Sequence, residues 1–439
     1  MVMKTPMRQR ILLLLCIPMM LSAGRAGSVD SLTVQNAVAL VLTRNPALAE
    51  ASHSVDAARA RVDLSKGGYL PSASIDATYT LLEPVAEIEF AGLGFKLYPA
   101  NNYDAHVGIR QPIYDFSRTG SQVNLADSRV TLAEDSRAAL VRDLAFRTVE
   151  TCYGILLLRQ SVSVQDEQVR TLNEHLTTTQ KKIASGTATQ LDALSTQVRV
   201  AAAQTQKINL ENALRRAETE LRRLAGLPQD TALVLRGDFT YQPLSGSQDS
   251  LTMIALHDRI EMKAANDAIE TATAQERSAR LSDMPSLNAF AVYGVKNGFM
   301  PNLDVLRGNL AAGAQLTIPI LDAHRSGSME EEATAMKNAA EARKREVDLS
   351  IRADVRQALD EYQASLEKIR VSEVNIEQAD RALENARLRY EAGTVQNIDL
   401  LDAATERAEA KLTNLQAAYD VIIANYRLRR AVGKPALEH

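Results

Sequence analysis

The chain repeats itself at a fixed spacing, and this limits the folds open to it more than any other feature. Gly and Pro residues that end helices or strands recur 207 residues later in the chain. The matched pairs are Gly186 with Gly393, Pro112 with Pro319 and Pro228 with Pro435, since 393 − 186, 319 − 112 and 435 − 228 all give 207. A constant spacing means that no net insertion separates the helical parts of the halves. We therefore predict two tandem structural repeats, over residues 27–247 and 248–439.

Each repeat contains a very long helical pattern. Mostly apolar residues recur every seven positions: Thr148, Ile155, Val162, Val169, Leu176 and Ile183 in the first repeat, and Val355, Tyr362, Ile369, Ile376, Leu383 and Tyr390 in the second. A sustained period of seven indicates left-handed supercoiling against neighbouring helices. A helix of roughly 68 residues is about 100 Å long, and no compact globular domain contains a helix of that length.

These patterns predict a helical hairpin in each half. The long helices are expected at about residues 117–184 and 190–225 in the first repeat, and at about 323–391 and 397–432 in the second. Gly186 and Gly393 stand where a helix ends on a left-handed residue. Thr394 or Asn397 can then cap the next helix, with Asp399 near its positive end.

The period changes from helical to alternating before each hairpin. Apolar and polar residues alternate over about residues 72–84, 102–114, 286–296 and 308–320. Such alternation is typical of strands with one apolar and one polar face. Shorter helices are expected before them, including one over residues 251–280. Pro71 and Pro285 also match, but they lie 285 − 71 = 214 residues apart, seven more than the usual 207. The first repeat therefore has about seven extra residues between its strands, and we place them in a loop around residues 82–101. The fold class is therefore mainly α with a small β part.

The first 26 residues read as a secretory signal peptide. A basic region precedes an apolar run over residues 11–21, and small residues precede a cut after Ala26 or Ala23. Cys16 lies in this segment, so the alternative that the protein is lipidated at Cys16 stays open. If it leaves with the signal peptide, Cys152 is the single remaining Cys and cannot form an internal disulfide, so we interpret it as a small core residue.

Composition argues against several classes of function. Aromatic residues make up 4% of the chain, Trp is absent, and the net charge is only −4. The sequence shows no basic stripe with interleaved aromatic residues, so we do not expect a nucleic-acid partner. The six His residues show no ligand spacing, and no phosphate loop or nucleophile elbow is present. We expect neither an enzyme nor a bound cofactor or metal.

Four strands cannot close a barrel, and lipid does not tolerate open sheet edges. Several copies should therefore share one barrel, and three copies would give about twelve strands. The same symmetry would arrange the long helices as a hollow cylinder. The two Gly turns would then lie about 100 Å from the barrel.

The chain resembles the TolC-type outer-membrane channel family over nearly its whole mature length. The sharpest matches are Tyr-Glu-Ala-Gly-Thr at 390–394, Ile-Asp-Leu-Leu-Asp at 398–402 and the twin turn at Gly186. The resemblance implies a homotrimer with a twelve-stranded barrel in outer-membrane lipid and an α-helical periplasmic tunnel. It implies a passive exit duct of a tripartite efflux or type I secretion system, in which an inner-membrane pump delivers substrates through a periplasmic adaptor. The adaptor would contact the hairpin tips at Gly186, Thr187, Gly393 and Thr394.

Two carboxylates are candidates for a pore constriction. Asp399 and Asp402 are three residues apart and share a helix face, so a trimer would stack them as cation-selective rings. The alternative is stabilisation of the helix start. Asp399 is matched by Asp192 in the first repeat, so a shared structural role is equally open. Asp402 is matched by Ser195, and for Asp402 we favour the pore.

The resemblance also implies a gate at the tip. In the family, a Tyr and a basic residue of the second hairpin tie the closed tip to an Asp of the first, and Tyr390 and Asp192 match these positions. Val395 stands at the basic position, so hydrogen bonds and packing, or another residue, must replace the ion pair. Tyr390 also continues the stripe of period seven, which leaves plain core packing open.

Two other classes remain to be compared with the channel. A non-conducting periplasmic or surface coiled-coil structural protein would need the helices but not the four alternating segments. An envelope enzyme would need a convergent polar constellation, which the sequence does not show.

Overall fold

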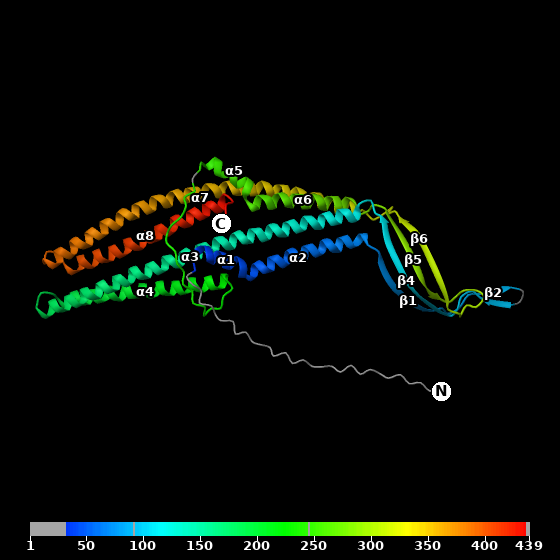
Figure 1. Ribbon diagram of the computed structural model, residues 1–439, viewed down its shortest axis with the longest axis horizontal. Helices are drawn as coiled ribbons and strands as arrows, with labels where there is room; N and C mark the ends of the chain where they lie inside the picture. Colours follow the sequence, from blue (N-terminus) through cyan, green and yellow to red (C-terminus); the bar gives the residue numbers. More distant parts are fainter. Residues whose placement is uncertain (1–31, 91–92, 245, 436–439) are drawn as a thin grey trace, which may run out of the picture.

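The computed structural model describes residues 32–90, 93–244 and 246–435, and it is an elongated, mostly helical molecule with a small sheet at one end (Figure 1). The predicted signal peptide at residues 1–26 lies outside these residues. The helices are α1 (Val34–Arg44), α2 (Pro46–Lys66), α3 (Arg118–Ala184), α4 (Gln190–Leu224), α5 (Gln248–Asp258), α6 (Ile260–Arg280), α7 (Arg325–Glu391) and α8 (Asn397–Ala431), with a 3-10 turn η1 (Gly67–Tyr69). The strands are β1 (Ser72–Leu81), β2 (Glu87–Phe90), β3 (Leu93–Lys96), β4 (Asn101–Tyr114), β5 (Ser286–Lys296) and β6 (Arg307–Thr317).

The duplication is visible in the lengths of the helices. α3 and α7 each have 67 residues, and α4 and α8 each have 35. Each pair forms a helical hairpin whose turn lies at the end of the molecule opposite the sheet (Figure 1). The predicted fold class, mainly α with a small β part in tandem repeats, is confirmed.

The sheet is antiparallel with the order β1-β4-β5-β6. In the register of this sheet, apolar residues of one strand pair with apolar residues of the next across all four strands. Ile75 pairs with Val107, Val107 with Tyr293, and Tyr293 with Leu310. All four side chains are exposed, Ile75 by 81%. One face of the sheet is therefore a continuous apolar surface that the described residues leave uncovered.

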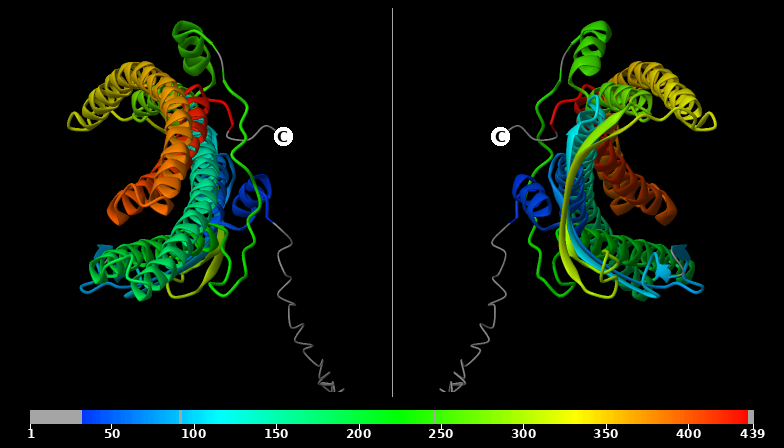
Figure 2. Two further views of the ribbon diagram at one scale, coloured as in Figure 1. Left: turned by 90° about the vertical axis from the view of Figure 1, so that its left-hand side faces the viewer. Right: turned by 90° about the vertical axis from the view of Figure 1, so that its right-hand side faces the viewer.

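Helices and strands follow one another in the same lateral order. α2 leads into β1, β4 into α3, α6 into β5 and β6 into α7. α3 packs between α2 and α6, and α6 packs against α7, so the helix order α2-α3-α6-α7 matches the strand order. Viewed end-on, helices and sheet form one curved layer (Figure 2). None of the described helices has a stretch long and apolar enough to span a membrane.

The segment between α4 and α5 crosses the convex side of this layer at mid-length, beside α1 (Figures 1 and 2). The Leu32 N–H donates to the Val234 carbonyl at 2.8 Å, and the Arg236 N–H donates to the Leu32 carbonyl at 2.9 Å. The largest apolar core lies beneath this crossing and includes Val149 and the fully buried Cys152. Burial raises the pKa of the Cys152 thiol to about 12, which agrees with its interpretation as a core residue.

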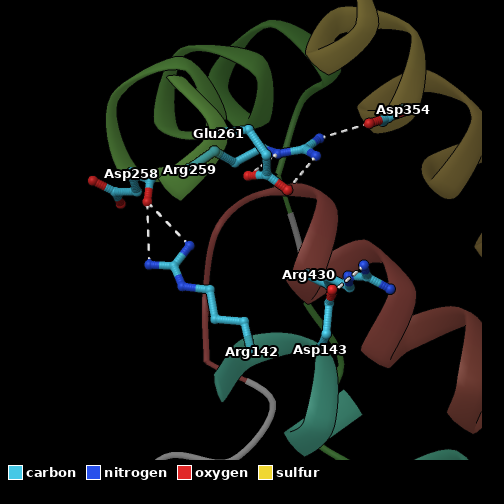
Figure 3. Close-up of polar contacts among 7 residues, drawn as sticks. All are labelled: Arg142, Asp143, Asp258, Arg259, Glu261, Asp354 and Arg430. Atoms are coloured by element: carbon cyan, nitrogen blue, oxygen red, sulfur yellow. Dashed lines mark hydrogen bonds and ion pairs between the residues drawn. The ribbon is translucent and has the colours of Figure 1, made fainter. Parts of the chain in front are cut away.

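Two sequence expectations about secondary structure were wrong. The segment expected to be one helix over residues 251–280 is broken at Arg259, whose ψ of 132° is extended. The Arg259 guanidinium bonds Asp354 of α7 at 2.8 Å and Glu261 at 3.0 Å (Figure 3). The loop expected around residues 82–101 contains the β2–β3 hairpin, paired from Glu87 with Lys96 to Phe90 with Leu93.

Polar contacts join the two repeats around the α5–α6 junction (Figure 3). The Arg142 guanidinium of α3 donates to the Asp258 carbonyl at 3.3 and 3.4 Å, and Arg430 of α8 pairs with Asp143 of α3 at 2.6 Å. Gly433, at φ +84°, packs so close to Asp258 that an added Cβ would lie 2.9 Å from its carbonyl carbon. The C-terminal end of α8 is thereby fixed against the α5–α6 junction.

Candidate pore-tip site

The two hairpin turns have the same local structure. Gly186 has φ +79° and Gly393 has φ +70°, as predicted for left-handed helix ends. The Thr187 N–H donates to the Lys182 carbonyl and the Thr394 N–H to the Arg389 carbonyl, both at 2.9 Å. This is the pattern of a Schellman motif. An added Cβ at either Gly would meet no heavy atom within 4 Å, so both turns are open at the end of the molecule.

The aspartates predicted at the helix starts are capping residues. The Asp192 carboxylate accepts from the Thr189 N–H at 2.8 Å, and the Asp399 carboxylate accepts from the Gln396 N–H at 2.9 Å. Each satisfies a backbone donor that the helix itself leaves free. The expectation that Thr394 or Asn397 caps α8 was wrong, because Gln396 is the N-cap residue. The Thr394 hydroxyl instead donates backwards to the Arg389 carbonyl at 3.0 Å.

Asn397 lies buried between the two hairpins, with 6% of its surface exposed. Its amide nitrogen donates to the Asp192 carbonyl at 3.2 Å and to the Thr196 hydroxyl at 3.4 Å, both on α4. Its amide oxygen lies 2.6 Å from Nε2 of His175 on α3. One side chain at the start of α8 therefore contacts both helices of the first hairpin.

Tyr390 of α7 also contacts His175. The two rings meet edge-on with centroids 5.2 Å apart, and Lys182 Nζ lies 4.1 Å from the centroid of the Tyr390 ring. Within the described residues, Tyr390 and Asp192 share no hydrogen bond, since the Asp192 carboxylate is held in its own cap. Burial, with a contribution from Lys182, lowers the pKa of His175, although the bond to Asn397 opposes this shift.

Asp402 is paired with a cation. Its carboxylate lies 2.5 Å from the guanidinium of Arg199 on α4, and about half of the Asp402 side chain is exposed. This ion pair links the first and second hairpins. In this chain, an Arg of the first hairpin therefore supplies a charge-pairing link that residue 395 cannot make.

Further contacts hold the hairpins together away from the tip. Arg407 and Lys411 of α8 each lie 3.0 Å from the Glu167 carboxylate of α3, and these hydrogen bonds lower its pKa. A small apolar cluster joins Leu172, Val200, Ala203 and Leu401. The first hairpin is thus bound to the second by both charge and packing.

Sequence reasoning missed His175, Arg199 and the bridging role of Asn397. Comparison of the two halves could have singled them out, because each departs from the repeat. At the matching positions, 207 residues away, the other half has Ala382, Glu406 and Gln190. The pore candidate Asp402, which is matched by Ser195, departs from the repeat in the same way. In the part of the chain that the structure describes, no group of three His, Cys, Asp or Glu could hold a metal.

Known proteins with the same architecture place the chain in a family. The family model described as outer membrane efflux protein matches residues 37–227 and 251–434. The alkaline protease secretion protein AprF of Pseudomonas aeruginosa is 26% identical over 342 residues, covering 76% of this chain and 70% of that protein. The outer membrane protein TolC of Vibrio cholerae is 22% identical over 394 residues, covering 89% and 88%.

Solved structures agree on the fold. The outer membrane protein VceC of Vibrio cholerae superposes with a TM-score of 0.76 at 18% identity, covering 92% of this chain and 97% of that one. The outer-membrane channel OprN also gives 0.76, at 20% identity, covering 92% and 90%. The chain belongs to the outer membrane efflux protein family, whose relatives serve efflux and secretion.

Proposed function

We propose that three copies of this chain form a channel through the outer membrane, with a roughly twelve-stranded barrel that continues into a periplasmic helical tunnel. The observation that carries the proposal is the common lateral order of strands and helices. Because both edges of the layer are unpaired among the described residues, β1 of one copy can pair with β6 of the next while their helices meet side by side. The apolar face of the closed sheet would then contact lipid.

Both helical edges carry exposed apolar side chains, as such a contact between copies needs. On α2 and α4 they are Leu64, Leu191, Leu194, Val198 and Ile208, and on α7 they include Leu349, Val371, Val374 and Leu388. Val371 and Val374 also line a groove between α7 and α8. Large apolar side chains exposed along an element mark an interaction surface. A second copy of the chain is the occupant that closes both edges at once.

The channel would be the passive exit duct of a tripartite efflux or type I secretion system. An inner-membrane pump would deliver substrates through a periplasmic adaptor, which would contact the open turns at Gly186, Thr187, Gly393 and Thr394. Asp192 and Tyr390 would take part in gating through the contacts of their helices. Asp399 and Asp402 would face the pore mouth, with Asp399 also serving as a cap.

Mass and conductance of the mature protein test the proposal. In detergent we expect a trimer, and in a planar bilayer we expect small, cation-selective steps from a tip that is mostly closed. A monomer or a rod that never conducts would favour the structural coiled coil and overturn the assignment of the sheet to a barrel.

The acidic ring makes a separate prediction. Asp402→Ala should weaken block of the channel by multivalent cations, because it removes three carboxylates per trimer and frees the Arg199 charges. Arg199→Ala should strengthen the block, because it leaves Asp402 uncompensated. Both are measured as the blocking concentration in single-channel recordings. Asp166→Ala, which removes the ion-pair partner of Lys207 away from the tip, is the control. Unchanged block in both tip variants would contradict the ring.

A further inference from the structure

Asn397 is the point at which the start of α8 is joined to both helices of the first hairpin. Its amide nitrogen has acceptors on α4 at 3.2 and 3.4 Å, and its amide oxygen has His175 of α3 at 2.6 Å. With only 6% of the residue exposed, water has little access to these groups. A buried amide that loses such partners without gaining others is destabilised.

Opening the tip would require the second hairpin to move away from the first. The contacts that resist this movement at the end of the molecule are the Asn397 bonds, the Arg199–Asp402 pair and the packing of Tyr390 on His175. The Arg199–Asp402 pair is half-exposed, and exposed pairs contribute little. The buried amide and the imidazole that holds it are therefore the main polar restraint at this end of the molecule.

Building on the channel function proposed above, we propose that Asn397 and His175 form the latch that keeps the tip closed, and that protonation of His175 releases it. The latch acts beside the Arg199–Asp402 pair, which supplies the charge-pairing link that Val395 cannot make. If the chain were not a channel, the same contacts would still hold the hairpins together, so latch and channel can fail separately.

The surroundings of His175 explain why protonation opposes closure. Along α3, Lys182 opposes a positive charge on His175, and the Thr179 hydroxyl lies 3.5 Å from Nε2. α4 contributes Asp192, whose carboxylate is occupied by its cap, and α7 contributes the Tyr390 ring. From α8 the ring meets the neutral Asn397, and the Asp402 carboxylate beyond it is paired with Arg199. A second positive charge beside Lys182 would thus be partly buried, and the attraction of Asp192 does not offset this burial, since the pKa of His175 is still lowered.

The direction of the pH effect follows from linkage. In the closed tip the pKa of His175 is lowered from its ordinary 6.5 by burial, whereas in an open, hydrated tip it returns towards that value. The open state therefore binds the proton more readily. Closure is fully supported above about pH 6.5 and is lost as the pH falls below it. This window lies well above the ordinary range in which carboxylates titrate.

Single-channel recordings between pH 7.5 and 5.5 test the latch. The ratio of open to closed time should rise in the unsubstituted protein by up to about tenfold per pH unit, the limit for one proton. His175→Gln keeps a donor for Asn397 but cannot titrate, so it should stay mostly closed at both pH values. Asn397→Ala should be open at both. His53→Gln, which changes an exposed His of α2, should respond to pH like the unsubstituted protein.

Hydrogen exchange at the start of α8, corrected for the intrinsic effect of pH, gives a second readout that does not need conduction. Acid should speed this exchange in the unsubstituted trimer but not in His175→Gln. A pH response that survives in His175→Gln, or Asn397→Ala protein that behaves like the unsubstituted channel, would overturn the latch. A protein that never conducts but shows His175-dependent exchange would overturn the channel and leave the latch standing.

Discussion

Replacing Gly294 by Ala is expected to prevent the sheet from forming in its observed register. Gly294 of β5 lies opposite His106 of β4, and an added Cβ would be 2.2 Å from the Ala105 carbonyl oxygen and 2.5 Å from the His106 Cα. Both are backbone atoms at the centre of the sheet, so no side-chain rotation can relieve the overlap. We expect a loss of at least about 4 kcal/mol, at the severe end for a single substitution.

Gly308→Ala is the matched control for this prediction. Gly308 lies on β6, and an added Cβ there would have its nearest neighbours, the Gly294 carbonyl and the Tyr293 hydroxyl, at 3.9 Å. That is ordinary van der Waals contact. The yield of trimer and the temperature at which it dissociates in detergent measure both variants. Equal behaviour of the two would show that β4 and β5 do not approach as closely as described.

The fold could be predicted from the sequence where its signals are periodic. The stripe of period seven, the strict alternation over residues 72–81 and the constant spacing of 207 residues depend only on the chain's own pattern. These patterns specify which face of an element is covered, and therefore the class of architecture. The two Gly turns were predictable for the same reason, because a left-handed residue at a helix end is a local requirement.

The features that could not be predicted depend on partners far away in the chain. Arg259 breaks a helical pattern that contains no Pro, because its guanidinium is held by Asp354, 95 residues later. Asn397 reads locally as a helix cap, but its amide bonds His175, 222 residues earlier. Arg199 and Asp402 are likewise joined only by the packing of the two hairpins. Local preference was overridden in each case by a tertiary contact.

Asp399 shows what the repeat could and could not decide. Its match to Asp192 favoured a structural role, and both carboxylates do cap their helices. The same match says nothing about which way the carboxylates face in an assembled trimer. A capping residue can also line a pore, so its pore role remains a prediction that the blocking experiment on Asp402 does not decide.

Lys263→Met is the second substitution expected to have a large effect. Lys263 of α6 pairs with Asp135 of α3 across the seam between the repeats, and it also lies 3.1 Å from Asp267. The Asp135 side chain is only 3% exposed, and its Oδ2 atom has no hydrogen-bond partner among the described residues. Without the ammonium, a buried carboxylate would face a second one. We expect a loss of about 3 kcal/mol, the lower end for a broken buried pair.

The loss should depend on pH in a definite direction. Burial already raises the pKa of Asp135, and removing Lys263 raises it further, because Lys263 is the group that lowers it. A carboxyl with a raised folded-state pKa is stabilising in its protonated form and destabilising once ionised. The deficit of Lys263→Met should therefore be largest at neutral pH and shrink towards pH 5. Hydrogen exchange of α6 amides, converted to local opening free energies, measures it.

A double variant separates lost charge pairing from lost packing at this seam. Asp135→Leu combined with Lys263→Met removes both charges and leaves apolar groups of similar size, so most of the stability should return, as it does when buried ion pairs are replaced by packing. Lys207→Met, which breaks the exposed pair with Asp166, should change little because water replaces the lost contact. If the double variant were as unstable as Lys263→Met alone, the lysine would act through its packing. Recovery of stability in the double variant would instead show that the α3–α6 contact requires balanced charges rather than the ion pair itself. This is the expected result, because α3 and α6 pack against each other where the two repeats meet.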